Sequence, residues 1–132
     1  MPKWRFTIEA QLPTDPSQTW ECGISRAKID RMVANSDEVW LARLVLVKGV
    51  LESPTRIIQG WGRDKEACLV YIGRPASDYR KAGIETPVKR GMLFAVFVLD
   101  GGPIDHWTWR LPTAEDPDMP DGMKGEIIWP KT

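Results

Sequence analysis

The sequence predicts one α+β domain, with an N-terminal strand and two helices packed on a mostly antiparallel sheet of four or five strands. Its 132 residues suit a single domain, and neither an internal repeat nor a change in composition divides residues 1–132. Apolar residues recur at helical spacing between residues 25 and 52. The second half instead holds short apolar runs bounded by glycine, proline and aspartate, which is typical of strands joined by turns.

The first predicted element is a strand that begins near the amino terminus. Every second position of it is apolar: Trp4, Phe6, Ile8 and Ala10. This period of two is typical of a strand with one buried face. We expect Pro13 and the segment 14–17 to end the strand.

Two helices are predicted next, forming a helical hairpin. Ser25 is suited to cap a short first helix, and residues 35–37 end it and open the second. The segment 38–51 is rich in valine and leucine and would also suit a strand. Its large apolar residues nevertheless fall at helical spacing: Trp40, Leu44, Val47 and Leu51. Pro54 prevents the helix from continuing.

The remaining chain predicts strands and one long loop. A short strand is expected at 56–59, a longer one at 67–72 and a central one at 91–99. Asp100, Gly101 and Gly102 then form a turn into a returning strand. On that strand, alternation assigns Ile104, His106, Thr108 and Arg110 to one face and Asp105, Trp107, Trp109 and Leu111 to the other. A last edge strand is expected at 126–129, after an acidic, proline-rich loop at 112–125.

Charge is balanced overall but unevenly distributed. Lysine and arginine number 18, as do aspartate and glutamate, so no global field attracts polyanions. Residues 56–90 carry eight basic and four acidic side chains, whereas residues 91–132 carry three basic and seven acidic ones. This pattern fits either an ordinary solvated surface or a local basic cleft that the acidic segment flanks or covers.

Several classes of function are not indicated. Cys22 and Cys68 lack the close spacing of a zinc site, and the chain has a single histidine, so we expect neither a metal nor another cofactor. No apolar run approaches the roughly 18 residues that span a bilayer, and the amino terminus lacks a signal-like apolar segment. We therefore expect a cytoplasmic protein with free thiols and no membrane partner.

Polar side chains in the second half form the candidate site. His106 is the candidate general acid or base, because its unperturbed pKa near 6.5 allows both protonation states at neutral pH. The alternative is a tolerated polar residue on a wet strand face. Arg110 lies on the same face, roughly 13–14 Å further along an extended strand, and Thr108 lies between them. Arginine suits phosphate because its planar fork matches phosphate geometry.

Other candidate contacts flank the strand at 67–72. Tyr71 and Arg74 stand on either side of Gly73, where an aromatic ring can stack on a base, although Tyr71 would equally suit the core. Arg63 is expected to point into the same cleft. Tyr79 and Arg80 combine an aromatic ring with positive charge, which suits phosphate contact plus stacking or else a solvated loop.

Part of the chain resembles a known group of small domains. The residues are the run 51–61, LESPTRIIQGW, and the run 69–75, LVYIGRP, followed by the strand residues Val98, Ile104, Trp107, Trp109 and Arg110. Over residues 38–111 this pattern resembles phage-associated domains grouped with barnase-like, colicin-like and RelE-like ribonucleases. The resemblance implies a cleft on the open face of the sheet with basic and aromatic residues. The chain departs from an equipped enzyme of this kind, because it offers one histidine and no obvious carboxylate beside it.

Two functions follow from these observations. The first is RNA binding or metal-independent RNA cleavage, toxin-like in kind, by His106, Arg74 and Arg110, with contacts from Tyr71, Arg63, Tyr79, Arg80 and Thr108. The second is a non-catalytic module in which exposed tryptophans and the acidic carboxy-terminal segment bind another protein.

Overall fold

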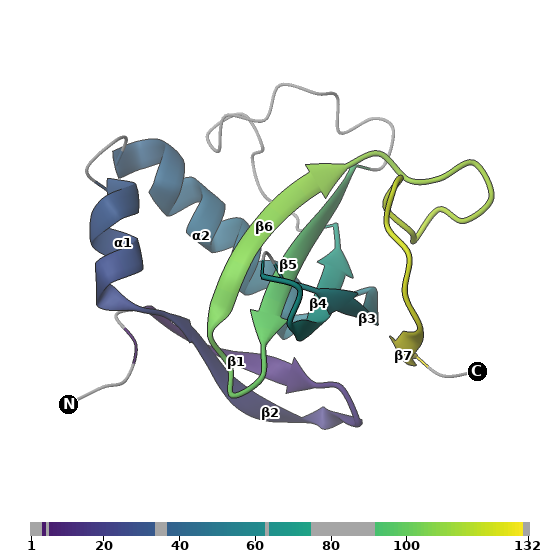
Figure 1. The fold of residues 1–132 in the computed structure, drawn as a ribbon, viewed down its shortest axis with the longest axis horizontal. Helices are drawn as coiled ribbons and strands as arrows, with labels where there is room; N and C mark the ends of the chain where they lie inside the picture. The colour runs from purple at the N-terminus through teal and green to yellow at the C-terminus, as the bar shows by residue number, and fades with distance from the viewer. Residues whose placement is uncertain (1–3, 5, 34–36, 63, 75–91, 131–132) are drawn as a thin grey trace.

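The computed structural model describes residues 4, 6–33, 37–62, 64–74 and 92–130, without the side chains of residues 32–41. It has two helices and two sheets (Figure 1), which confirms the α+β class. The elements are β1 (Phe6–Leu12), β2 (Asp15–Ile24), α1 (Arg26–Val33), α2 (Asp37–Glu52), β3 (Arg56–Trp61), β4 (Ala67–Gly73), β5 (Leu93–Leu99), β6 (Ile104–Arg110) and β7 (Ile127–Trp129). Neither helix is long and apolar enough to cross a bilayer, as far as the structure describes the chain.

The N-terminal strand does not join the main sheet. It pairs antiparallel with β2, a strand that the sequence did not predict, and the two form a separate sheet. Residues 13–14 turn the hairpin rather than ending an isolated strand. Trp20, Cys22 and Ile24 recur at every second position of β2, but Pro16 and Gly23 obscured this pattern. Proline is tolerated here because β2 is an edge strand.

Both helices agree with the sequence pattern. The backbone N–H of Lys28 donates to Ser25 Oγ at 3.2 Å, so Ser25 caps α1 as expected. In α2, the buried residues Leu44, Val47 and Leu51 face the interior. The strand alternative for this segment is therefore wrong, and the helix ends two residues before Pro54.

The main sheet has five strands in the order β6-β5-β4-β3-β7, and each neighbouring pair is antiparallel. The predicted β5–β6 hairpin is confirmed. Gly101 and Gly102 turn it with φ values of 88° and 104°, which glycine adopts without strain. The predicted last short edge strand is confirmed as β7, which pairs with β3.

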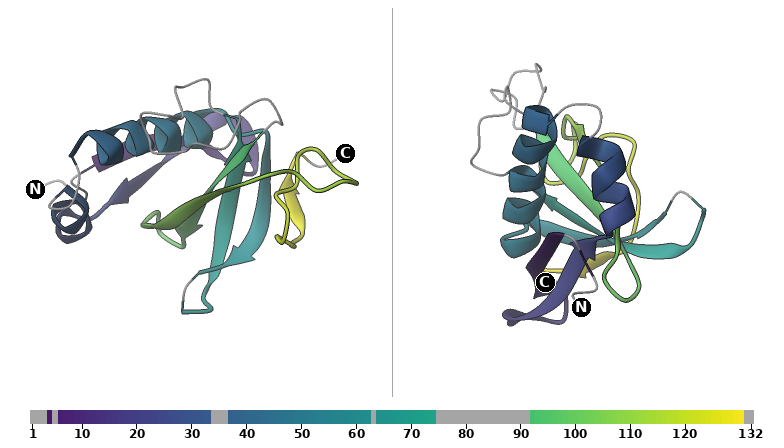
Figure 2. Two further views of the ribbon diagram at one scale, coloured as in Figure 1. Left: turned by 90° about the horizontal axis from the view of Figure 1, so that it is seen from above. Right: turned by 90° about the vertical axis from the view of Figure 1, so that its left-hand side faces the viewer.

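The two faces of the main sheet have different covers (Figure 2). Helix α2 and the β1–β2 hairpin pack on one face, here called the core face, which includes Ile57, Tyr71, Phe94 and Val96. The opposite face, here called the loop face, includes Ile58, Val70, Ile72, Ala95 and Phe97. Residues 112–126 contact the loop face through Met119 and Met123. The acidic segment is thus an ordered cover of the sheet.

Trp107 and Trp109 belong to the core face. The Trp109 ring stacks on Phe94 with centroids 6.2 Å apart, and the Arg43 guanidinium of α2 lies 5.1 Å from its centroid. The two tryptophans share a face of β6, as the alternation of the strand predicted. Their burial leaves the other face of β6 for polar side chains.

Candidate functional site

Strand β6 places three of the predicted residues on the loop face. His106 lies opposite Phe97, Thr108 opposite Ala95, and Arg110 opposite Leu93. Residues directly opposite one another in an antiparallel pair share a face, so His106, Thr108 and Arg110 stand in one row. The structure brings these three together as the alternation of the strand predicted.

A β-bulge adds a carboxylate to this row. The register pairs Phe97 with His106 but Val98 with Ile104, so Asp105 is an extra residue in β6. Asp105 Oδ2 lies 2.6 Å from His106 Nδ1. Alternation had assigned Asp105 to the opposite face, next to Trp107, and that prediction is wrong. The histidine therefore has the carboxylate neighbour that the sequence did not reveal.

A side chain of α1 binds the backbone of this β-bulge. The ammonium of Lys28, on α1, donates to the carbonyl of Ile104 at 3.1 Å and also to the carbonyl of Asp105. A bulge interrupts the ladder and leaves backbone groups in need of other partners. Lys28 supplies them, so the position of Asp105 depends on α1 as well as on β6.

The imidazole of His106 is fixed on two sides. Its ring stacks on Phe97 with centroids 4.1 Å apart and planes 14° from parallel. Its Nδ1 contacts the carboxylate, and the two side chains are 21% and 16% exposed. When Nδ1–H donates to Asp105, Nε2 is the nitrogen that accepts or gives a proton. The pair is thus an oriented histidine–aspartate dyad with partial access to solvent.

Two arginines on this side of the sheet are held by the acidic loop. Arg56 Nη1 lies 2.6 Å from Asp116 Oδ2, and Arg74 Nη1 lies 2.9 Å from Asp118 Oδ1. Arg74 also donates to the carbonyl of Pro117. The hydrogen bond from Arg56 lowers the pKa of Asp116 below its ordinary value, with a further contribution from the Asp118 N–H. The acidic segment therefore neutralises both of these arginines.

Two other cations on this side of the sheet keep their charge. Arg110 Nη1 donates to the carbonyl of Asp121 at 3.0 Å. Among the residues that the structure describes, neither Arg110 nor Lys124 forms an ion pair with a carboxylate. Both line a pocket of about 230 Å³ together with Trp61 and Phe97. Its lining thus combines two cations with aromatic surface.

Tyr71 does not join this row. Tyr71 is fully buried on the core face, where its hydroxyl donates to the Gln11 carbonyl at 2.5 Å and accepts from Trp20 Nε1 at 2.7 Å. Burial raises the pKa of the Tyr71 phenol well above its ordinary value. The structure therefore separates Tyr71 from His106. Arg63, Tyr79 and Arg80 lie outside the described residues.

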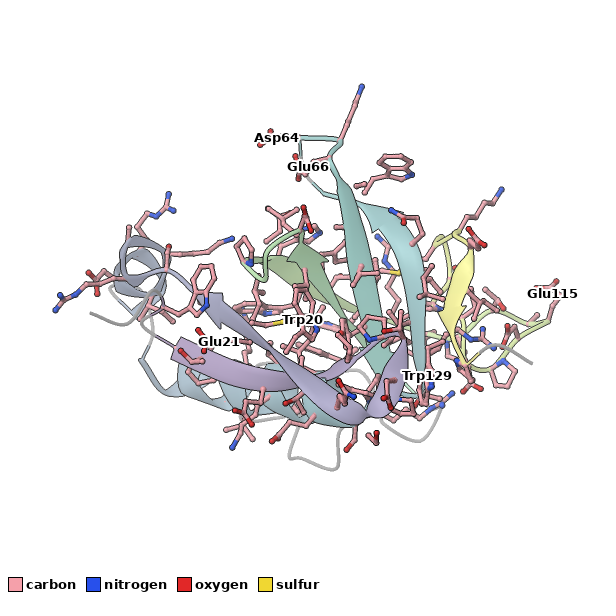
Figure 3. The ribbon with its side chains drawn as sticks, turned by 90° about the horizontal axis from the view of Figure 1, so that it is seen from below. Trp20, Glu21, Asp64, Glu66, Glu115 and Trp129 are labelled. Atoms are coloured by element: carbon pink, nitrogen blue, oxygen red, sulfur yellow. The ribbon has the colours of Figure 1, made fainter. Side chains whose placement is uncertain are left out.

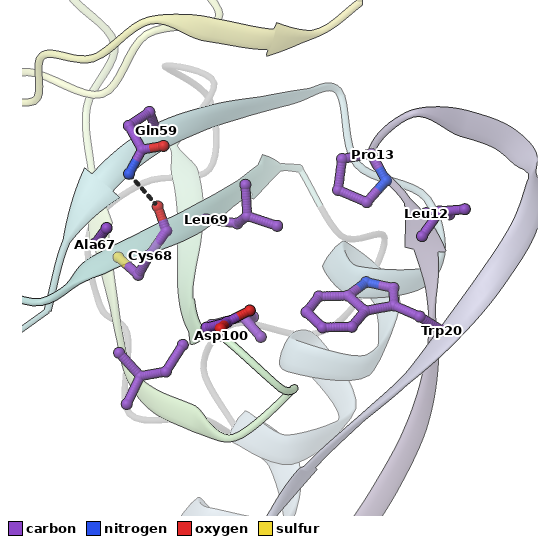
Figure 4. A pocket seen from close by; sticks show the side chains of 10 residues that line it. Leu12, Pro13, Trp20, Gln59, Ala67, Cys68, Leu69 and Asp100 are labelled. Atoms are coloured by element: carbon purple, nitrogen blue, oxygen red, sulfur yellow. Dashed lines mark hydrogen bonds between the residues drawn. The ribbon is translucent and has the colours of Figure 1, made fainter.

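A larger cavity, of about 480 Å³, lies between the β1–β2 hairpin and the main sheet (Figure 4). It is lined mainly by apolar side chains, with the Trp20 ring at one side, and Gln59 donates there to the Cys68 carbonyl at 3.2 Å. Its described lining contains no histidine, arginine or lysine. Burial raises the pKa of the Cys68 thiol to about 11, which disfavours a nucleophilic thiolate. Among the described residues, the oriented histidine–aspartate dyad thus lies outside this cavity, on the loop face.

Charged side chains elsewhere do not form a metal site. Figure 3 shows Asp64 and Glu66 together at the β3–β4 turn, whereas Glu115 lies at the distant end of the acidic loop. Across the described part of the chain, no group of three or more histidine, cysteine, aspartate or glutamate side chains is arranged to hold a metal ion.

Sequence reasoning missed Asp105, Trp61, Phe97 and Lys124. Trp61 was not among the predicted contacts, and it is the last residue of β3, with a side chain that is 63% exposed. The glycines on either side of Trp61 were the available signal, because small neighbours leave a large ring uncovered. For Asp105 no signal was available, since a bulge is set by the register of two strands.

Comparisons with family models, with curated proteins and with solved structures find no match to this chain. The resemblance to small ribonucleases therefore stays a prediction.

Proposed function

We propose that this protein binds RNA on the loop face and cleaves it by acid–base catalysis at His106. The observation that carries the proposal is the 2.6 Å contact between His106 Nδ1 and Asp105 Oδ2, in a row with Arg110. A histidine oriented by a carboxylate is a competent general base. An arginine on the same face supplies a cation for phosphate oxygens.

The proposed reaction is transfer of the phosphoryl group to the neighbouring 2′-hydroxyl. His106 Nε2 takes the proton of the 2′-hydroxyl as its oxygen attacks phosphorus. The imidazolium, stabilised by Asp105, returns that proton to the departing 5′-oxygen, which leaves a 2′,3′-cyclic phosphate and a free 5′-hydroxyl. Arg110 donates to the non-bridging oxygens as charge develops on them. One histidine is sufficient, because the proton that it removes is the proton that it returns.

Arg74 is a weaker candidate than Arg110 for direct contact with the phosphate. Its guanidinium is already bound to Asp118, so phosphate must displace a carboxylate to reach it. Thr108 stands between His106 and Arg110 on β6 and suits a hydrogen bond to the substrate. Both residues remain in the proposal as RNA contacts.

The test is cleavage of a labelled mixed-sequence RNA at low salt with a chelator present. We expect the wild type to cleave and His106→Ala to lose roughly 10²- to 10⁴-fold in rate, as for loss of a general base. Asp105→Asn should also slow cleavage, because the amide stabilises an imidazolium less well. Glu115→Gln, at an exposed loop position, is the matched control for a changed acidic side chain.

Equal cleavage by wild type and His106→Ala would contradict the proposal. A folded wild type that neither binds nor cleaves RNA would favour the alternative, a module that binds another protein. That alternative is supported by Trp61, since exposed tryptophans are frequent anchors of protein interfaces. The same purified variants distinguish the two functions.

A further inference from the structure

The β1–β2 hairpin covers only part of the core face of the main sheet. Along β4, Tyr71 is fully buried, Leu69 is half-buried and Ala67 is exposed, and all three alternate onto this face. Trp61 of β3, paired with Ala67 on the same face, is 63% exposed. The cavity of about 480 Å³ lies where the cover ends, between the sheet residues Leu69 and Ala67 and Pro13 of the hairpin.

Trp20 of β2 forms an aromatic wall of this cavity in a fixed orientation (Figure 4). Its indole Nε1 donates to the Tyr71 hydroxyl at 2.7 Å, and that hydroxyl donates in turn to the Gln11 carbonyl. The ring is half-buried. Because its N–H is already bonded, the indole presents its apolar surface to a ligand, which suits contact with a flat ring or a cation.

Two polar side chains of the cavity, Gln59 and Asp100, act as acceptors. Gln59 Nε2 donates to the carbonyls of Gly60 and Cys68, each at 3.2 Å, so its amide hydrogens are used and its oxygen is left to accept. Asp100 adds a carboxylate directly after β5. Within the described ranges of the chain, no cation forms an ion pair with Asp100. A ligand that matches this lining must supply hydrogen-bond donors and positive charge.

The volume and the lining together indicate the class of ligand. Pockets for small organic molecules have volumes of about 300–1,000 Å³ and are mainly apolar, with a few polar groups. This cavity lies within that range, and its apolar side chains include Leu12, Leu69 and Val98. They suit a flat hydrocarbon ring. An ammonium group beside the Trp20 ring and the Asp100 carboxylate gains a cation–π contact and an ionic contact.

We propose that this cavity binds a small aromatic amine in its protonated form, with its ring against Trp20 and Leu69 and its ammonium group at Asp100. The cavity lies on the face of the sheet opposite the histidine–aspartate dyad, so it is a second site and does not depend on the proposed function. A carboxylate of equal size is disfavoured, because Asp100 repels it and the described lining contains no cation.

The test is a calorimetric titration of the wild type with two probes of matched shape, tryptamine and indole-3-propionate. Both carry an indole ring on an ethylene chain, and they differ in the charge of the terminal group. We expect tryptamine to bind several-fold more tightly. Asp100→Asn should weaken tryptamine binding roughly 1.4- to 5-fold, the range for an exposed charge pair, and reduce the difference between the probes. Asp30→Asn, at an exposed position of α1, is the matched control and should change neither affinity.

Ala67→Phe tests the place of binding. Ala67 is exposed at the cavity, so the larger side chain fills space there without removing a core contact. This variant should lose tryptamine binding. In isotope-labelled wild type, tryptamine should also shift the NMR signal of the Trp20 indole N–H, because that ring lines the cavity.

Equal affinity of the wild type for the two probes, or no binding of tryptamine, would overturn the inference. Tryptamine binding that persists in Ala67→Phe and leaves the Trp20 signal unmoved would place the ligand elsewhere and overturn it as well. The comparison of probes uses the wild type alone, so it decides the matter even if a variant fails to fold. RNA cleavage is a separate readout, since none of these substitutions changes His106 or Arg110.

Discussion

Asp105 shows how the placement of one residue changes the chemistry of its neighbour. In a regular strand it would face away from His106, and the histidine would be an isolated polar side chain. The bulge turns the carboxylate to within 2.6 Å of Nδ1. The stack on Phe97 then limits the rotation of the ring. Both constraints orient Nε2, which is the atom that the proposed reaction uses.

At the residue scale we also predict that Tyr71→Phe lowers stability without affecting cleavage. The substitution removes the hydroxyl that joins Trp20 Nε1 to the Gln11 carbonyl inside the core. Leaving a buried donor and acceptor unpaired costs about 1–3 kcal/mol in the free energy of unfolding, which denaturant titration measures. If Tyr71→Phe kept full stability but lost cleavage, this prediction would be wrong and Tyr71 would contribute to the reaction.

At the scale of elements, the acidic loop is a structural part of the sheet. Its methionines cover apolar residues of the loop face, and its aspartates bind Arg56 and Arg74. Hydrogen bonds within the loop stabilise it further, including the Asp116 N–H to Thr113 Oγ1 at 3.0 Å. The sequence predicted only an acidic, proline-rich loop, because charge and prolines are visible in a sequence and contacts with a sheet are not.

We predict a pH-dependent contribution from the contact between Arg56 and Asp116. The folded-state pKa of Asp116 lies below its ordinary value of 3.8, so the contribution to stability is present above pH 3.8. It is lost as the pH falls through the lower folded-state pKa. Asp116→Asn should reduce stability at pH 7 by less than about 1 kcal/mol, since the pair is partly exposed.

Denaturant titrations of wild type and Asp116→Asn at several pH values check this prediction. The difference in unfolding free energy should shrink below pH 3.8. Glu115→Gln controls for the loss of one acidic side chain in the same loop. A difference between wild type and Asp116→Asn that grew as the pH fell would contradict the sign of the effect.

The sequence predicted some helices and strands better than others. Both helices, β3, β4 and the β5–β6 hairpin follow from periodicity and turn residues, which are local signals. Strand β2 was missed because proline and glycine interrupt its alternation. The candidate site was predicted at His106, Thr108 and Arg110, which need only one strand. Asp105 and the role of the loop depend on pairings between distant segments, and periodicity contains no information on these.

At the scale of the whole molecule, the balanced charge hides an asymmetry. Eighteen positive and eighteen negative side chains give no net charge, yet the acidic loop neutralises Arg56 and Arg74 and leaves Arg110 charged. Attraction of a polyanion therefore depends on a few positions near Arg110 and not on a field around the whole protein. The affinity for RNA should therefore depend only weakly on salt concentration.

We predict a slope of about −1.4 when the logarithm of RNA affinity is plotted against the logarithm of salt concentration. Each phosphate contact with single-stranded RNA contributes about −0.7, and we count two contacts, from Arg110 and Lys124. Lys124→Ala should reduce the slope by about half. The double variant Asp116→Asn/Asp118→Asn should tighten binding and steepen the slope, because it releases Arg56 and Arg74. Fluorescence anisotropy at several salt concentrations measures both quantities, and a slope unchanged in Lys124→Ala would contradict the assignment.

The hydrogen bonds from Lys28 to the bulge also have a consequence for the order of assembly. Lys28 and Ile104 are 76 residues apart, so their contact closes a long loop of chain. During synthesis the helix that carries Lys28 emerges well before β6 exists. The histidine–aspartate dyad is then complete only after the β5–β6 hairpin has packed against α1. If the protein cleaves RNA as proposed, a nascent chain on the ribosome is inactive until the domain has closed.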